Sequence, residues 1–347
     1  MARLEEICDI LDSRRIPITA SDRKPGPYPY YGANGIQDYV SDYIFDDELV
    51  LLAEDGGNFG SKEKPIAYRV SGKCWVNNHA HVLKPKDMLD VDYLCYSLMF
   101  YDVSGLVNGA TRQKLTQADM RKMEIPLRSM SEQKRITAVI NKVSDLISLR
   151  KQQLTKLDEL VKARFVEMFG DPELNPRGLP VLPWNAVFLT TTGKLDSNAM
   201  VENGRYPFFT CAKESYKIDS YAFDCEALLL AGNNAAGIYD VKHYKGKFNA
   251  YQRTYVLRLM NEKWSYILFK RQLEDKLQYL QSQSKGTNTR YLTLGILNEL
   301  RFVVPPVAEQ EQFAVFVEQT DKSKVAVQKA LDKAQLLFDS LMQKYFG

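Results

Sequence analysis

The sequence is poor in the residues on which many stable metal and disulfide sites depend. Its 347 residues include only three histidines and five cysteines, and the cysteines are scattered without a CxxC pair. This pattern argues against a disulfide framework or a zinc site. No apolar run approaches the ~18 to 20 residues of a membrane span, and the first residues lack the basic and apolar segments of a secretory signal. We therefore expect a cytoplasmic protein with no membrane contact.

Catalytic signatures are also missing. The chain contains no GxGxxG, phosphate-binding loop, GxSxG or HExxH motif, and no Asn/Asp-Pro-Pro-aromatic tetrapeptide of an amino-methyltransferase. Asp119 and Glu132 formally resemble the acidic positions of a nuclease core, but the second half lacks the following lysine. His79 and His81 would share one strand face without a recognisable acidic partner, so we expect exposed histidines there. We predict no catalytic residue and no metal, and hence a chain that is not an enzyme.

The dominant feature that is present is an internal duplication. Residues 28–31 (Tyr-Pro-Tyr-Tyr) recur as 206–209 (Tyr-Pro-Phe-Phe), an offset of 206 − 28 = 178. Gly109 recurs as Gly286, an offset of 286 − 109 = 177. Solenoid repeats have periods of roughly 20 to 50 residues, so this duplication copies a whole domain with its connector. A protein built in this way usually contacts two equivalent partners.

Each copy combines an α+β domain with a long helix. Residues 49–53 and 227–231 are predicted to be buried strands, and 91–101 and 262–280 have helical spacing. The strands do not alternate regularly with helices, which favours α+β over α/β. We place the two domains at 1–130 and 171–307, and the long connecting helices at 131–170 and 308–347.

The two helices carry a heptad pattern. A helix of about 40 residues is roughly 60 Å long, too long for one such domain to cover, so we expect the duplicates to pair as an antiparallel coiled coil. The alternative is that each helix lies singly on its own domain. The predicted seam and subunit-docking residues are Ile136, Ile140, Val143, Ile147, Leu154, Leu157 and Val161 in the first helix and Phe313, Val317, Leu331, Phe338 and Leu341 in the second.

Polar, glycine-containing loops recur at matching positions with different side chains. Asn, Gln and Arg side chains can contact base edges, whereas Lys side chains and loop amides bind phosphates. Asn and Gly are also common in turns that bind nothing. We therefore predict DNA contact for the loops as a whole and not for any single residue. The net charge of +3 permits DNA binding without requiring it. The candidate DNA contacts are Asn58, Asn78, His79, Arg112, Lys114, Asn233, Gln252, Arg253, Asn288 and Arg290.

A recurrent signature gives the chain a family resemblance. It consists of Leu-Thr, then Ile or Val before proline, then Glu-Gln at a helix start. The signature comprises Leu115-Thr116, Ile125-Pro126 and Glu132-Gln133, then Leu292-Thr293, Val304-Pro305-Pro306 and Glu309-Gln310. With these motifs the chain resembles the specificity subunit of Type I restriction-modification systems, although the first copy has Leu127 where a second proline is usual.

The resemblance implies a function for both copies. Each recognition domain would read one half of a bipartite double-stranded DNA site from the major groove, and the paired helices would set the spacing. Two methyltransferase subunits would dock near the helices, and restriction subunits would join them. S-adenosylmethionine, ATP and Mg²⁺ would belong to those partners, with no cofactor in this chain. The alternatives are a structural tether that binds no DNA, and a stand-alone nuclease or methyltransferase.

Overall fold

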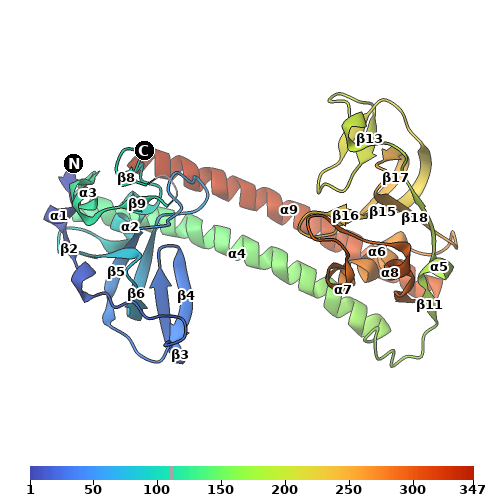
Figure 1. Ribbon diagram of the computed structural model, residues 1–347, viewed down its shortest axis with the longest axis horizontal. Helices are drawn as coiled ribbons and strands as arrows, with labels where there is room; N and C mark the ends of the chain where they lie inside the picture. Colours follow the sequence, from blue (N-terminus) through green and yellow to red (C-terminus); the bar gives the residue numbers. More distant parts are fainter. Residues whose placement is uncertain (110–111) are drawn as a thin grey trace. The chain divides into compact units, whose positions relative to one another are not determined.

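The computed structural model describes residues 1–109 and 112–347, which form two compact units. The first unit comprises Met1–Lys151 with Lys329–Gly347, and the second comprises Gln152–Gln328. Each unit contains a sheet domain and parts of two long helices, α4 (Met130–Phe169) and α9 (Val307–Phe346) (Figure 1).

The two sheets share one topology. In spatial order the first contains β2 (Cys8–Ile10), β7 (Ala80–Pro85), β5 (Phe45–Ala53), β6 (Ala67–Val76), β3 (Pro25–Gly32) and β4 (Gly35–Val40). The second contains β12 (Phe188–Thr192), β18 (Thr254–Leu259), β15 (Phe223–Ala231), β17 (Val241–Ala250), β13 (Tyr206–Phe209) and β14 (Tyr216–Ile218). In both, one pairing is parallel, β3 with β6 and β13 with β17. The duplication read from the sequence is thus a duplication of structure.

Short elements complete each unit. Among the residues that the structure describes, four two-stranded pairs are β1 (Ala2–Arg3) with β10 (Glu124–Ile125), β8 (Val107–Asn108) with β9 (Lys114–Leu115), β11 (Val181–Pro183) with β20 (Arg301–Val303), and β16 (Asn233–Asn234) with β19 (Arg290–Tyr291). The shorter helices are α1 (Leu4–Ile7), α2 (Val91–Met99), α3 (Gln117–Lys122), α5 (Trp184–Val187), α6 (Tyr266–Asp275), α7 (Leu277–Gln283) and α8 (Leu294–Asn298), with 3₁₀ turns at η1 (Asp12–Arg14) and η2 (Ser197–Ala199). Within the described ranges, no helix is both long and apolar enough to cross a bilayer.

The central strand of each sheet is buried on both faces. In β5, Val50 and Leu52 pack in the core that includes residues of α2 and α4, whereas Leu49 and Leu51 pack in a cluster on the opposite face. The β15 strand divides its leucines in the same way between two clusters. Burial on both faces explains why these strands are continuous apolar runs instead of alternating ones.

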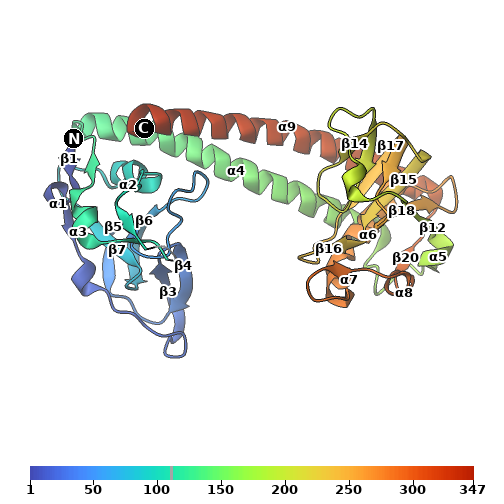
Figure 2. The same ribbon diagram turned by 45° about the horizontal axis from the view of Figure 1, so that its top comes forward.

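The long helices pack on each other in opposite directions. In the first unit, the early part of α4, including Ile136 and Ile140, shares a core with Phe338 and Met342 near the end of α9. In the second unit, Phe165 near the end of α4 packs on Phe313 near the start of α9, with ring centroids 5.6 Å apart. Figure 2 shows the two helices side by side. The predicted antiparallel pairing is confirmed, and the single-helix alternative is wrong.

The predicted seam positions face inward. The buried positions are Ile136, Ile140, Val143, Ile147 and Phe338 in the first unit and Val161 and Phe313 in the second. The half-buried positions are Leu331 and Leu341 in the first unit and Leu154, Leu157 and Val317 in the second. At Lys324, a seam position without an apolar side chain, the ammonium lies 2.6 Å from Asp158 Oδ1. Lysine tolerates this place because its apolar stem covers the seam while its charge is paired.

A buried glutamine hydrogen-bonds each long helix to its domain. Gln133 is fully buried, and its Oε1 accepts the backbone N–H of Asp90, the N-cap of α2, at 2.8 Å. Its Nε2 donates to the carbonyls of Met88 and Arg128 at 2.9 and 2.8 Å. This amide explains why Gln follows Glu in the recurrent signature.

The second unit repeats this fastening. The Oε1 of Gln310, which is also fully buried, accepts the N–H of Ser265, the N-cap of α6, at 3.0 Å. Its Nε2 donates to the carbonyl of Pro305 at 2.8 Å. The same side chain thus joins a domain helix to a long helix in both copies.

We expect Gln133→Ala to destabilise the first unit by about 2 to 4 kcal/mol, because it leaves several buried backbone groups without partners. Gln310→Ala should act similarly on the second unit. Calorimetric unfolding of each variant measures the effect. Glu132→Ala, which removes only a 3.7 Å surface pair with Arg128, is the control and should cost less than about 0.5 kcal/mol. Equal stability of the Gln133 variant and this control would contradict the role of the glutamine.

Candidate nucleic-acid interface

Three loops meet at one end of the sheet in the first unit. They are the loop after β5, the β6–β7 turn and the β8–β9 hairpin. The backbone N–H of Glu54 donates to the carbonyl of His79 at 2.9 Å, and the N–H of Leu115 donates to the carbonyl of Glu54 at 2.7 Å. Residue 54 therefore joins all three loops through its backbone alone.

The second unit makes the equivalent bonds. The N–H of Gly232 donates to the carbonyl of Arg253, and the N–H of Leu292 donates to the carbonyl of Gly232, both at 2.8 Å. The three loop pairs that the sequence aligned are thus brought together in each unit. Residues 110–111, which belong to one of the predicted loops, lie outside the described residues.

A glycine shapes the third loop in both units. Gly109 and Gly286 have φ angles of 102° and 100°, a region that residues with a Cβ rarely occupy. A Cβ would lie 2.4 Å from the carbonyl oxygen of Arg112 in one case and 2.2 Å from that of Thr289 in the other. The recurrence of this glycine therefore follows from sterics.

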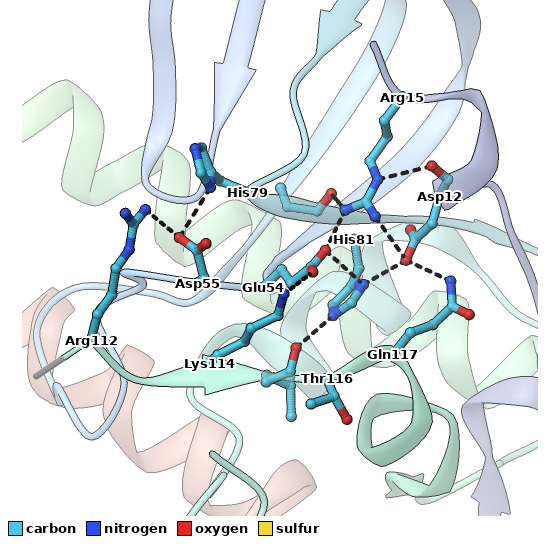
Figure 3. Close-up of polar contacts among 12 residues, drawn as sticks. Asp12, Arg15, Glu54, Asp55, His79, His81, Arg112, Lys114, Thr116 and Gln117 are labelled. Atoms are coloured by element: carbon cyan, nitrogen blue, oxygen red, sulfur yellow. Dashed lines mark hydrogen bonds and ion pairs between the residues drawn. The ribbon is translucent and has the colours of Figure 1, made fainter. Parts of the chain in front are cut away.

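The first unit presents a charged set on this frame. Asp55 Oδ1 lies 3.0 Å from His79 Nδ1 and also accepts from the guanidinium of Arg112 (Figure 3). The Arg112 side chain is 60% exposed and that of Asp55 only 20%. The carboxylate of Asp55, a hydrogen-bond acceptor, is therefore held beside the exposed guanidinium of Arg112, which can donate two hydrogen bonds.

The second unit presents an aromatic and amide set at the equivalent positions. A cavity of about 520 Å³ is lined by Asn233, Tyr251, Arg253, Thr289 and Tyr291. The β16–β19 pairing places Asn233 opposite Tyr291, as the bridge in the first unit places Asp55 opposite Lys114. The two surfaces therefore differ in chemistry while sharing one backbone arrangement.

Five of the ten residues predicted to contact DNA belong to these two sets, namely His79, Arg112, Lys114, Asn233 and Arg253. The others lie nearby in the loops but outside the sets. Asn78, Gln252 and Asn288 are exposed, and Asn58 is half-buried. Arg290 is exposed but directs its guanidinium to the carbonyl of Gln281 at 3.4 Å.

Sequence reasoning missed four members of these sets, Asp55, Tyr251, Thr289 and Tyr291. All four lie within or beside the loops that the duplication aligned. Residue type alone does not single them out, because acidic residues are unusual next to phosphates and tyrosines are common in protein cores. The offset between the copies was the available signal, since it pairs Asp55 with Asn233 directly.

Below the charged surface lies a buried ionic cluster. His81 is fully buried, and its Nδ1 lies 2.6 Å from Asp12 Oδ2. Arg15 and Lys114 contact the two oxygens of Glu54 at 2.5 and 3.0 Å. The expectation of an exposed His81 without an acidic partner is therefore wrong, because its partner comes from η1, 69 residues earlier in the chain.

Both ring nitrogens of His81 have oxygen partners. Its Nε2 lies 3.0 Å from the carbonyl oxygen of Leu115, and its Nδ1 faces the Asp12 carboxylate. In the second unit the hydroxyl of Tyr255 donates to the carbonyl of Leu292 at 3.0 Å. The equivalent backbone carbonyl is therefore held by an imidazole side chain in one unit and by a phenol in the other.

The cluster holds its carboxylates ionised. Burial by itself would raise the pKa of Asp12, but hydrogen bonds from His81, the Val82 amide and Gln117, together with the charge of His81, bring that pKa below its usual value. Burial likewise opposes ionisation of Glu54, and Arg15 and Lys114 outweigh it, so the pKa of Glu54 is also lowered.

Asp12, Glu54 and His81 also satisfy the spacing of a metal site, with one potential ligand atom each within 4.8 Å of the others. Both Glu54 oxygens, however, contact resident cations, and both His81 nitrogens are hydrogen-bonded. A metal ion would have to displace Arg15 and Lys114. The donor set therefore fits an ionic cluster that supports the loops better than a metal centre.

The chain thus combines two copies of one α+β scaffold, each with three converging polar loops and with parts of both long helices. The chain belongs to the family described as the Type I restriction modification DNA specificity domain, which matches residues 1–159 and 187–336.

Individual relatives agree with this family. Over 145 residues the chain is 37% identical to a putative type I restriction enzyme specificity subunit of Haemophilus influenzae, covering 42% of this chain and 37% of that protein. Over 141 residues it is 39% identical to the EcoDI specificity subunit of Escherichia coli, covering 39% and 30%. The matched segments thus span only about a third of the length of these relatives. The crystal structure of an S subunit from M. genitalium shares the fold, with a TM-score of 0.69 at 15% identity over 100% of this chain and 95% of that one.

The ionic cluster predicts a sensitivity of the first unit to acid. Because the pKa values of Asp12 and Glu54 are lower in the folded state, their stabilising contribution is complete above their ordinary values of 3.8 and 4.5 and is lost as pH falls below them. Amide-exchange protection of β5 and β7 should therefore fall between pH 5 and about 3.

Glu54→Gln is the matched variant for this measurement. The substitution should lower the free energy of unfolding by about 2 to 4 kcal/mol at pH 7, because Arg15 and Lys114 lose their carboxylate partner. It should also make amide-exchange protection depend less on pH in acid. The β18 amides of the second unit, where Gly232 replaces Glu54, are the internal reference. An equal acid response of wild type and variant would refute this role for the cluster.

Proposed function

We propose that this chain is the DNA-reading specificity subunit of a Type I restriction-modification complex, in which each unit reads one half of a bipartite double-stranded site. One observation carries the proposal: an identical three-loop frame presents Asp55 with Arg112 in one unit and Asn233 with Tyr291 in the other. Side chains of Asp, Arg and Asn can discriminate base edges in the major groove. Different sets on one frame suit two different half-sites.

The paired long helices would set the separation of the half-sites. Their antiparallel packing, seen independently in both units, supports this role. Rigid connection of two reading elements is how other two-site DNA-binding proteins specify spacing.

We propose that two methyltransferase subunits dock on the helix surface outside the seam, and that restriction subunits join this core. Two equivalent partners require two equivalent surfaces. Leu160 and Leu337 occupy duplicate positions, 337 − 160 = 177 residues apart, and are 47% and 50% exposed. Exposed leucines at matching positions on both helices support such docking.

The chain would itself be non-catalytic and would act in the cytoplasm, where the complex meets DNA. S-adenosylmethionine, ATP and Mg²⁺ are assigned to the partner subunits. The acidic and basic groups around Glu54 favour this assignment, because they pair with one another and so are not available to bind a cofactor. Turnover by the purified chain given DNA, Mg²⁺ and S-adenosylmethionine would refute it and would favour a nuclease or methyltransferase.

The reading function is tested by sequencing the methylome of cells that express this chain with a Type I methyltransferase. We expect a bipartite methylated motif. Replacing residues 1–130 by those of a relative should change one half of the motif only, and replacing 171–307 should change the other half only. Absence of any motif would instead favour a protein tether that binds no DNA.

The docking surface is tested with Leu160→Asp and Leu337→Asp. Each should reduce the complex from two methyltransferase subunits to one, and the double variant should bind neither, as measured by native mass spectrometry. Both side chains are about half exposed, so unfolding should change by less than about 1 kcal/mol. Leu174→Asp, at an 80% exposed leucine outside the long helices, is the control. Full assembly of the double variant would rule out this surface.

A further inference from the structure

Residues 55 and 233 occupy the same place in the two reading surfaces. Each follows the residue whose backbone joins the three loops, Glu54 or Gly232. Each also pairs with the residue before the Leu-Thr signature, Lys114 or Tyr291. The two side chains are nearly identical in shape, but one is a carboxylate and the other an amide. The side chains of residues 55 and 233 therefore differ in charge and in hydrogen-bonding chemistry, and not in shape.

The carboxylate of Asp55 is acceptor-only, and its neighbours are donors. In a C·G pair, the major-groove edge presents the N4 amine of cytosine beside the O6 and N7 acceptors of guanine. A carboxylate in contact with an exposed guanidinium matches this edge, because Asp55 can accept from cytosine while Arg112 donates to guanine. The negative charge of Asp55 would be repelled by DNA phosphates. Its presence on this surface therefore argues that it accepts a hydrogen bond from a specific base.

The amide of Asn233 both donates and accepts, and its neighbours are aromatic. Asn is suited to the N6 and N7 atoms of adenine, and apolar surfaces contact the methyl group of thymine. Tyr291 lies opposite Asn233 and lines the same 520 Å³ cavity, as does Tyr251. This set matches the edge of an A·T pair, and Arg253 at its border remains available for a neighbouring guanine or phosphate.

We propose that residues 55 and 233 are the specificity-determining positions of the two units. Asp55, with Arg112, selects a C·G pair in one half-site; Asn233, with Tyr291, selects an A·T pair in the other. This inference rests on the proposed reading of DNA and adds the base pair that each position selects.

The experiment uses the full chain in complex with a Type I methyltransferase, with random-sequence DNA duplexes as the probe. Bound duplexes are recovered and sequenced. Asp55→Asn should reduce the C·G preference at one position of one half-site by about tenfold or more, and should increase selection of A·T there. Asn233→Asp should reduce the A·T preference at one position of the other half-site by a similar factor.

Two further variants separate base reading from folding and from phosphate contact. Arg112→Ala, at a 60% exposed side chain, should relax the same position as Asp55→Asn. Asp47→Asn removes an ion pair with Lys84, 2.6 Å long and at the opposite end of β5, and should leave the motif unchanged. Melting temperatures confirm that each variant is folded.

The outcomes distinguish this inference from the function on which it rests. A wild-type bipartite motif that both Asp55→Asn and Asn233→Asp retain, or that they weaken equally on all sequences, would overturn the assignment of these positions and leave the reading function intact. If the wild-type complex selects no motif, both proposals fail together. A change confined to one half-site for each variant supports both.

Discussion

The reading surfaces depend on one constraint, the backbone hydrogen bonds that join three loops at residue 54 in the first unit and residue 232 in the second. Because backbone groups make these bonds, they place little demand on side-chain identity. The same backbone bonds are made by Glu54 in one unit and Gly232 in the other, and by their partners His79 and Arg253. The glycine at 109 and 286 cannot vary in this way, since any Cβ would collide with a carbonyl oxygen. Side-chain chemistry can therefore diverge while the geometry of the loops persists.

The layer beneath the loops shows how far this divergence extends. Where the first unit uses the imidazole of His81, Glu54 and two basic side chains, the second uses the phenol of Tyr255 and a glycine. Both arrangements hold the carbonyl of the signature leucine. The ionic version supplies charged donors at the surface through Lys114, and the phenolic version leaves room for a cavity. The support and the reading surface have therefore changed together.

The sequence predicted those features that local patterns determine. The apolar runs in β5 and β15, the heptad seam and the approximate bounds of the two long helices all follow from residue order and backbone chemistry. The cluster around His81 could not be found in this way, because Asp12 and His81 are distant in sequence and meet only when η1 packs against β7. Asp55 was accessible in principle, since aligning the two copies pairs it with Asn233. Recognising its role required seeing Arg112 and His79 converge on its carboxylate.

Duplication of a domain with a long helix also determines how each unit is completed. The first unit contains residues 329–347, so its core uses the end of the second copy's helix. Tyr93 of α2 packs against Phe346 with ring centroids 5.1 Å apart, and Tyr96 packs against Phe338. The second unit receives Phe165 and Phe169 from the helix of the first copy in return. Each recognition domain therefore has part of its core supplied by the other copy. A substitution where α4 packs on α9 therefore changes the core beneath a reading surface that is encoded far away in the sequence. The pairing of the helices is coupled in this way to both surfaces.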